Sequence, residues 1–199
     1  MQMPDKYGTG QDPYCYPGTD ILINKFDIQD KVVLNEAERE ITTAALNGIS
    51  FSLPPYDLAY LKKLHRLLFS PIYDWAGKIR SIDISKGDTR FCTRSRIEPE
   101  ANKIFSSLGN KKYFENSSPN ALIGQMAALY ADLNMVHPFR EGNGRTQRIL
   151  FEHIALNCGY GIDWGVASTT EWLKANAQGA NCEFMLLEAI FQSALSEIA

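Results

Sequence analysis

The sequence predicts a mostly helical domain with one small β-hairpin. Apolar residues recur at helical spacing through most of the chain, and a single segment alternates in the way a strand pair does. Hydrophobic residues make up 45% of the 199 residues, the proportion of an ordinary globular protein. At this length one domain is expected, so we treat 1–199 as a single domain that begins with an irregular arm over 1–20.

Seven stretches show the apolar periodicity or the end signals of helices. The first opens with the acidic residues Glu36 and Glu38, which would suit the positive end of its dipole. Asp57 is placed to cap the second, and Ser118 followed by Pro119 marks the start of the fourth. Gly159 is a typical terminator for the fifth. The expected ranges are 35–47, 57–68, 98–108, 119–136, 143–157, 171–176 and 183–196.

The segment 79–91 is the one convincing strand pair. Its first half alternates around Ile79, Ile82 and Ile84, and the pattern resumes at Thr89. Gly87 lies between the two halves and supplies the turn. This pattern predicts a β-hairpin.

The residues that carry chemistry are concentrated at a joint between two helices, in 137–148. Gly142, Asn143 and Gly144 offer backbone amides that can converge on an anion, and the following helix adds the positive end of its dipole. Arg145 and Arg148 are three residues apart, so we expect both to point to one side of that helix. Two guanidinium groups at a helix N-terminus predict a polyphosphate site.

Three further residues of the joint complete this hypothesis. Glu141 would repel phosphates unless a divalent cation lay between them, and Mg²⁺ is commonly held by one carboxylate plus substrate phosphates. His137 is the residue best able to take up a proton near pH 7. Phe139 is expected to point inward as an anchor. No P-loop, dinucleotide fingerprint or HExxH motif competes with this interpretation.

The twelve residues HPFREGNGRTQR resemble the signature of the Fic family, HPFx[D/E]GNGRxxR, at every specified position. The stretch from Tyr73 to Phe91 looks like the hairpin "flap" of that family, and Gly10 to Tyr14 is similar to bacterial Fic toxins. The resemblance extends over nearly the whole chain. It implies the all-α, mostly helical Fic fold: a helical bundle with a flap at 79–91 beside a catalytic loop and helix start at 137–148.

The resemblance also implies an activity. Most members with the full motif are protein adenylyltransferases, which move AMP from ATP to a Ser, Thr or Tyr hydroxyl of a target protein and release pyrophosphate. His137 would be the catalytic base, Glu141 would hold Mg²⁺ against the α- and β-phosphates, and Arg145 and Arg148 would bind the β/γ end. The implied nucleotide-binding residues are Glu141, Gly142, Asn143, Gly144, Arg145, Thr146, Gln147 and Arg148, together with Ile84, Ser85, Lys86 and Gly87 of the flap.

The flap would bind the target by strand addition. Ordinary solvated turn residues are the alternative for its tip. Trp172 and Asn176, four residues apart on one helix, are candidates for the adenine pocket, with simple packing as the alternative. His65 and His153 are expected to be structural. The flap residues assigned to target binding are Ser85, Lys86, Gly87, Asp88 and Thr89.

Many Fic proteins carry an inhibitory helix, [S/T]xxxE[G/N], whose Glu pairs with the second arginine, here Arg148. Only Ser193 and Glu197 have that spacing, and Ile198 follows where Gly or Asn belongs. Glu115 is followed by Asn116, but Lys111 occupies the Ser/Thr position. The sequence therefore predicts a toxin restrained by a separate small antitoxin whose inhibitory helix contacts Arg148.

Several alternatives remain open. A secreted effector that modifies host proteins ranks second. A transfer of another phosphate-containing group is a further option, although relatives that transfer phosphate replace the second motif glycine, here Gly144, with lysine. A non-catalytic nucleotide-binding module is disfavoured by intact His137 and Glu141. Type II topoisomerase subunits are the target that the resemblance suggests at family level.

Composition narrows the location and the partners. Lys and Arg total 20 and Asp and Glu total 23, a net charge of -3 that argues against direct nucleic-acid binding. The start of the chain lacks a signal-peptide pattern, and no run of eighteen apolar residues predicts a membrane span. The four cysteines form no CxxC pair, which favours reduced thiols and a cytoplasmic protein.

Overall fold

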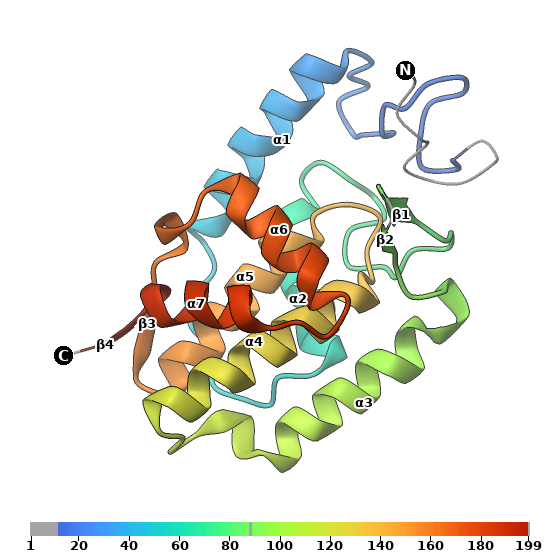
Figure 1. Ribbon diagram of the computed structural model, residues 1–199. Helices are drawn as coiled ribbons and strands as arrows, with labels where there is room; N and C mark the ends of the chain where they lie inside the picture. The colour runs from blue at the N-terminus through green and yellow to red at the C-terminus, as the bar shows by residue number, and fades with distance from the viewer. Residues whose placement is uncertain (1–11, 88, 199) are drawn as a thin grey trace.

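The computed structural model describes residues 12–87 and 89–198, and this part of the chain is mostly helical (Figure 1). The predicted fold class, a helical body with a small hairpin, is therefore confirmed. The helices within the described residues are α1 (Lys31–Leu46), α2 (Leu58–Phe69), α3 (Ile97–Asn110), α4 (Pro119–Val136), α5 (Asn143–Asn157), α6 (Thr169–Gly179) and α7 (Met185–Ala194). Short 3-10 turns at Arg94–Arg96, Lys112–Phe114 and Trp164–Val166 join some of them.

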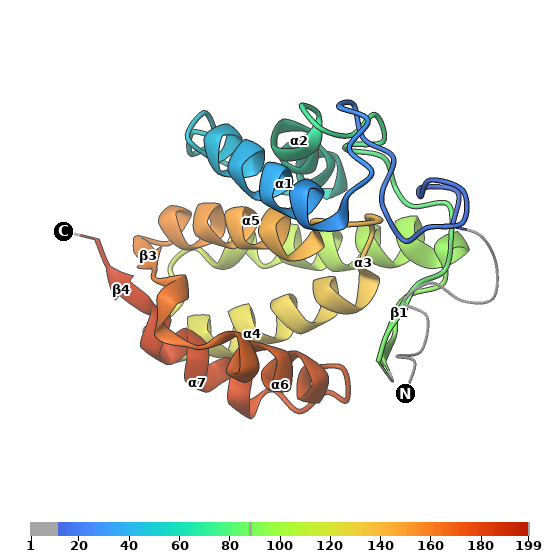
Figure 2. The same ribbon diagram turned by 90° about the horizontal axis from the view of Figure 1, so that it is seen from above.

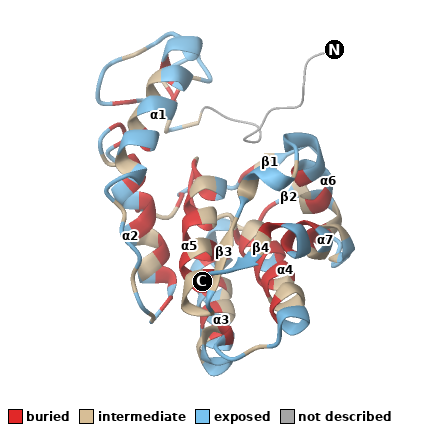
Figure 3. Ribbon diagram, turned by 90° about the vertical axis from the view of Figure 1, so that its left-hand side faces the viewer, coloured by how far each residue is buried: buried red, intermediate tan, exposed pale blue. Residues whose placement is uncertain are grey.

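Helix α5 lies in the middle of the body, with α1 and α2 on one side and α4, α6 and α7 on the other (Figure 2). Figure 3 shows the buried residues on the inner faces of α2, α4 and α5, while α1 and α3 carry long exposed faces. Phe69, Phe151 and Phe191 are fully buried in this core. The joint between α4 and α5 is therefore anchored on both sides by packed helices.

Several predicted helix ends are confirmed. The carboxylate of Asp57 accepts a hydrogen bond from the backbone N–H of Tyr60 at 2.7 Å, as an N-cap residue does. Ser118 is extended and Pro119 is the first residue of α4, although the serine side chain makes no capping hydrogen bond. Gly159 follows the end of α5 with φ +86°, the left-handed conformation that glycine adopts easily.

The first helix begins four residues earlier than predicted. The carboxylate of Asp30 accepts hydrogen bonds from the backbone N–H groups of Val32 and Val33, at 2.8 and 3.0 Å. These bonds start α1 at Lys31, so its first turn contains no acidic residue, and the predicted acidic first turn is wrong. A good cap can start a helix at exposed β-branched residues that carry no apolar periodicity.

The predicted hairpin is present but short. Strand β1 (Ser85–Lys86) pairs antiparallel with β2 (Thr89–Arg90), and the expected extension from 79 to 91 is wrong. The flanking backbone binds the α4–α5 joint instead: Arg80 N–H donates to Pro138 O and Cys92 N–H to Met135 O, both at 2.9 Å. Asp88, at the turn, lies outside the described residues.

A second strand pair forms where none was predicted. Strand β3 (Tyr160–Ile162) pairs antiparallel with β4 (Leu195–Glu197), so the last helix ends at Ala194 and not at 196. Strands of three residues are too short to show an alternating pattern, so they could not be predicted from the sequence. Asp163 N–H donates to Ala194 O at 2.9 Å and extends the pairing.

The described part of the predicted arm, 12–20, consists of turns and an isolated bridge between Cys15 and Leu22. It is not detached from the body, because Cys15 is buried in the main hydrophobic core. The remaining residues of that prediction, 1–11, lie outside the described part. Within the residues that the structure describes, every helix is too short or too polar to cross a lipid bilayer.

Candidate active site

His137 ends α4 in the left-handed conformation, with φ 44° and ψ 62°, and the following Pro138 cannot continue the helix. Its ring stacks on Phe91, just past β2, with centroids 3.8 Å apart and planes 16° from parallel. Nδ1 lies 3.1 Å from the backbone carbonyl of Asn134. Because a carbonyl can only accept, Nδ1 carries the hydrogen, and the lone pair of the neutral ring is on Nε2.

Asn143 and Phe139 lock the loop together. Phe139 is fully buried, as the sequence predicted for an anchor. Its backbone N–H donates to Asn143 Oδ1 at 2.8 Å, and Asn143 Nδ2 donates to its carbonyl at 2.7 Å. The side chain of Asn143 therefore holds the loop closed, while its backbone belongs to the first turn of α5, where N–H groups lack intrahelical partners.

His65 of α2 braces the same loop from below. The Gly77 N–H donates to its Nδ1 at 2.8 Å, and its Nε2, 3.0 Å from the Glu141 carbonyl, donates in turn. The ring is fully buried and stacks on Phe139, with centroids 3.8 Å apart. Burial lowers the pKa of His65 to about 4, so the ring is neutral at pH 7 and keeps this donor and acceptor pattern.

The two glycines of the loop have different environments. Gly142 has φ +79°, and a Cβ built there would lie 2.2 Å from the fully buried ring of Phe69. Only glycine fits this position. A Cβ at Gly144 would meet nothing within 4 Å, although Gly144 lines the pocket. The protein therefore leaves open space on the pocket side of Gly144.

Glu141 lies between the buried Arg140 and Gly142 and lines the pocket. Its Oε1 accepts a hydrogen bond from the Gly142 N–H at 3.1 Å. Within the described residues no group of three or more His, Cys, Asp or Glu side chains could hold a metal ion. One carboxylate at a pocket wall fits Mg²⁺ held mainly by substrate phosphates and does not fit zinc.

The two arginines of α5 diverge, and the expectation that both point to one side is wrong. Arg145 reaches α1, where Nη1 donates to Thr42 Oγ1 at 3.1 Å and Nη2 pairs with Glu38. Its guanidinium also lies 4.7 Å from the centroid of the Phe69 ring. Arg148 turns toward the pocket. Residues three apart differ by about 60° around a helix, enough for long side chains to reach different neighbours.

Thr146 and Gln147 also face the interior rather than the pocket. Thr146 Oγ1 donates to Gly142 O at 3.0 Å, and Gln147 Nε2 donates to Tyr130 O at 2.7 Å. Both side chains are buried. They hold α5 to the loop and to α4, and neither residue is among those that line the pocket described below.

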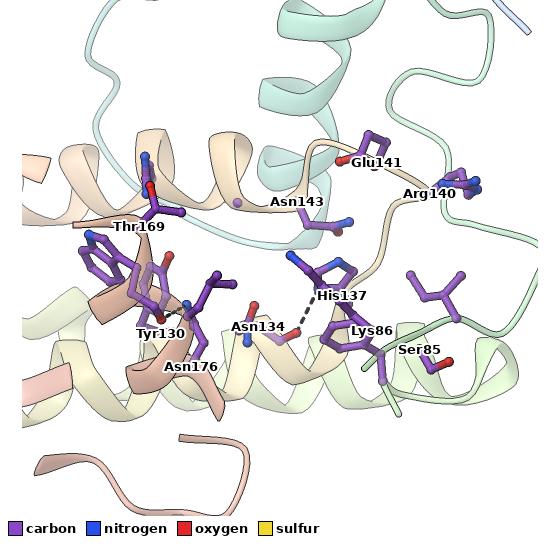
Figure 4. A pocket seen from close by; sticks show the side chains of 16 residues that line it. Ser85, Lys86, Tyr130, Asn134, His137, Arg140, Glu141, Asn143, Thr169 and Asn176 are labelled. Atoms are coloured by element: carbon purple, nitrogen blue, oxygen red, sulfur yellow. Dashed lines mark hydrogen bonds between the residues drawn. The ribbon is translucent and has the colours of Figure 1, made fainter. Parts of the chain in front are cut away.

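A pocket of about 250 Å³ lies between the loop, the flap, α4 and α6 (Figure 4). The predicted residues that it brings together are Ile84, Ser85, Lys86, His137, Glu141, Asn143, Gly144, Arg148, Trp172 and Asn176. Gly87, with φ +56°, and Thr89 belong to the exposed end of the hairpin and do not line it. Lining residues that the sequence reasoning missed are Phe91, Tyr130, Asn134, Arg140, Thr169 and Leu173.

The α6 end of the pocket holds two unsatisfied polar atoms. Trp172 is 5% exposed, and neither its Nε1 nor Asn176 Oδ1 has a hydrogen-bond partner within the described residues. Asn176 Nδ2 donates to the Trp172 carbonyl at 2.8 Å, which fixes the amide. Arg148 lies 5.6 Å from the ring centroids of both Trp164 and Trp172. A buried donor and a buried acceptor without partners suit a flat heteroaromatic ligand.

The pocket combines a helix start, a histidine with its lone pair on Nε2 and a carboxylate, groups that suit an enzyme of the nucleotidyltransferase class. The Fic/DOC family model matches residues 55–155, which include the flap and the loop. The chain is 40% identical to the probable protein adenylyltransferase Fic of Salmonella typhimurium and 38% identical to that of Escherichia coli K12, over 98% of each chain. This protein belongs to the Fic/DOC family, and its enzyme class is protein adenylyltransferase.

Solved structures agree with this assignment. The N-terminal Fic domain of a VirB-translocated Bep effector protein from Bartonella quintana, with bound ADP, superposes with a TM-score of 0.85 at 25% identity. The superposition covers 92% of this chain and 94% of that one. The architecture is thus the mostly helical Fic fold with a small hairpin beside the catalytic loop.

Proposed function

We propose that this protein transfers AMP from ATP to a Ser, Thr or Tyr hydroxyl of a target protein and releases pyrophosphate. One observation carries the proposal: His137, Glu141, the start of α5 and Arg148 all line the same pocket, beside the β1–β2 hairpin. The names of the two bacterial relatives support it.

The phosphates would lie against the first turn of α5, where backbone N–H groups and the helix dipole favour negative charge. Arg148 lines the pocket and is the arginine assigned to them, whereas Arg145 is engaged by Glu38 and Thr42. The adenine ring would lie at the α6 end of the pocket. There Asn176 Oδ1 can accept a hydrogen bond from the exocyclic amine, and Trp172 Nε1 can donate one to a ring nitrogen.

The proton transfer follows from the orientation of His137. With Nδ1 donating to the Asn134 carbonyl, Nε2 takes the proton from the target hydroxyl. The hydroxyl oxygen then bonds to the α-phosphorus, and the bond from that phosphorus to the bridging oxygen breaks, so that pyrophosphate leaves. The stacked Phe91 ring keeps the imidazole in place during this step.

Glu141 is the residue that would hold Mg²⁺. The bound ion would neutralise charge on the α- and β-phosphates, as divalent ions do in phosphoryl transfer. The peptide N–H of Gly142 holds the Glu141 carboxylate, and His65 Nε2 holds the Glu141 backbone carbonyl. Orientation of the carboxylate is thus built into the loop.

The test is His137→Ala. We expect the variant to fold and to bind a non-hydrolysable ATP analogue with unchanged affinity, while transfer falls about 10²–10⁴-fold, the usual contribution of a general base. Mass spectrometry of the target identifies an AMP adduct, and it separates this activity from transfer of another phosphate-containing group and from simple nucleotide binding. Wild-type transfer by His137→Ala would falsify the assignment.

We also propose regulation by a separate antitoxin that contacts Arg148, with the chain acting as a bacterial toxin in the cytoplasm. The two internal candidates for an inhibitory Glu are engaged elsewhere. Glu197, in β4, lies 3.5 Å from the Tyr160 hydroxyl, and Glu115 accepts from Asn157 Nδ2 at 3.2 Å. Arg148 instead lies over two indole rings.

Expression of the chain alone in bacteria tests this second proposal. Growth arrest with AMP adducts on bacterial proteins, type II topoisomerase subunits first among the candidates, would support a toxin. Harmless expression of a chain that modifies only eukaryotic proteins would favour the secreted-effector alternative.

A further inference from the structure

The segment 12–14 touches both halves of the active site. On the loop side, Arg140 Nε donates to Asp12 Oδ2 at 2.7 Å, and Nη2 lies 2.6 Å from the same oxygen. The two side chains are 1% and 7% exposed, so this ion pair is removed from solvent. Arg140 directly precedes Glu141, and the pair therefore ties the segment to the catalytic loop.

On the flap side the contact is made by Tyr14. Its hydroxyl oxygen accepts from the Ser81 N–H at 3.0 Å and lies 3.2 Å from Ser81 Oγ. The Tyr14 N–H donates to Asp12 Oδ1 at 2.9 Å, and its ring packs edge-on against Trp75, with centroids 5.6 Å apart. One carboxylate thus holds both the arginine of the loop and the tyrosine that reaches the flap.

Ser81 is the root of the flap. Its carbonyl accepts from Arg94 Nη1 at 2.8 Å, which joins the two ends of the 81–94 segment. The preceding Arg80 is buried and donates from Nε to the His137 carbonyl at 2.8 Å. Just after β2, at the base of the hairpin, Phe91 stacks on His137. The position of Ser81 therefore helps to set where the hairpin lies relative to His137.

We propose that Tyr14 is a positioning residue for the transfer reaction, whose hydroxyl fixes the root of the flap above the catalytic loop. This inference rests on the proposed function, because it assumes that the flap binds the target. The hydroxyl hydrogen bond lies at the protein surface, so it contributes little to global stability. Its loss would instead shift the position of the flap, and with it the register in which a target segment pairs with the flap.

Tyr14→Phe removes one oxygen and keeps the ring against Trp75. The matched control is Tyr16→Phe: the Tyr16 hydroxyl belongs to the same part of the chain but donates to Asp27 Oδ1 at 3.0 Å, and contacts neither loop nor flap through that bond. Two measurements are made on both variants and on the wild type. The first is amide hydrogen exchange, and the second is KM for a target protein with ATP saturating.

For Tyr14→Phe we expect exchange in 81–92 to be about two- to thirteenfold faster, the range for one lost surface hydrogen bond of about 0.5–1.5 kcal/mol. KM for the target should rise by a similar factor with kcat and the affinity for an ATP analogue unchanged. Tyr16→Phe should match the wild type in both measurements.

Unchanged exchange and unchanged KM in Tyr14→Phe would overturn the inference, and so would faster exchange spread through α4 and α5, which indicates general loosening. If the wild type transferred no AMP while exchange in 81–92 still differed between the two variants, the tether would stand and the proposed function would fail.

Discussion

The loop at 137–148 is held by buried contacts from α2 and from its own asparagine, whereas the flap opposite it is a pair of two-residue strands, each with one exposed and one half-buried side chain. Loop backbone groups are bound by His65 and Asn143, and Phe69 leaves no room beside Gly142. Lys86 and Arg90 of the flap are exposed. In the proposed reaction, the groups that would meet the phosphate are held by buried contacts, and the groups that would bind a protein segment lie on a short, partly exposed hairpin.

The substitution expected to disrupt the loop most is Gly142→Ala. The left-handed backbone costs about 1–2 kcal/mol for a non-glycine residue, and overpacking against Phe69 adds about 1–3 kcal/mol. We expect the free energy of unfolding in urea to fall by about 2–5 kcal/mol, with transfer lost.

Gly144→Ala is the matched control for that change. Its Cβ meets open space, so we expect stability within about 0.5 kcal/mol of the wild type and weaker binding of an ATP analogue measured by calorimetry. Equal losses of stability in the two variants would contradict the different roles assigned to the two glycines.

The His65 brace predicts a dependence of stability on pH. Its pKa is about 4 in the folded chain against an ordinary 6.5, so the unfolded chain binds this proton at a higher pH. Protonation of His65 therefore does not change the free energy of unfolding above pH 6.5. As the pH drops from 6.5 to 4 it lowers that free energy, by about 3 kcal/mol once the pH is below 4.

Comparison with His65→Gln isolates this effect, since other titrating groups are common to both chains. Urea unfolding from pH 7 to pH 4 should show a steeper loss for the wild type than for the variant. Parallel curves would mean that the histidine is not kept neutral by its burial.

The smallest effect on stability is expected in the flap. Lys86→Ala removes an exposed charge that lines the pocket, and stability should stay within about 0.5 kcal/mol of the wild type. Nucleotide affinity should fall about fivefold at low salt, from a charge interaction of about 1 kcal/mol, and less at high salt. Arg90→Ala, also exposed but paired with Asp83 at 3.9 Å and outside the pocket lining, is the control and should change affinity little.

The sequence predicted which loop residues would lie together because they are contiguous: the pocket lining from this region falls within 137–148. It could not identify the groups that hold the loop, because His65, Phe69 and Arg80 come from distant segments whose patterns indicate only helix or strand. Arg145 shows the limit of spacing arguments. Its direction is decided by Glu38 on α1, a partner 107 residues away. Tyr130 and Asn134 line the pocket from a helix face that resembles ordinary core.

The position of Arg148 has a practical consequence. Two of the three tryptophans in the chain lie 5.6 Å from its guanidinium, and one of them lines the pocket. A phosphate that draws the guanidinium away would change the surroundings of both indoles, and a nucleobase that stacks on Trp172 would change those of that ring. We therefore expect the intrinsic fluorescence of the unmodified protein to change when the pocket is filled, so that ligand titrations can be made before any target is known.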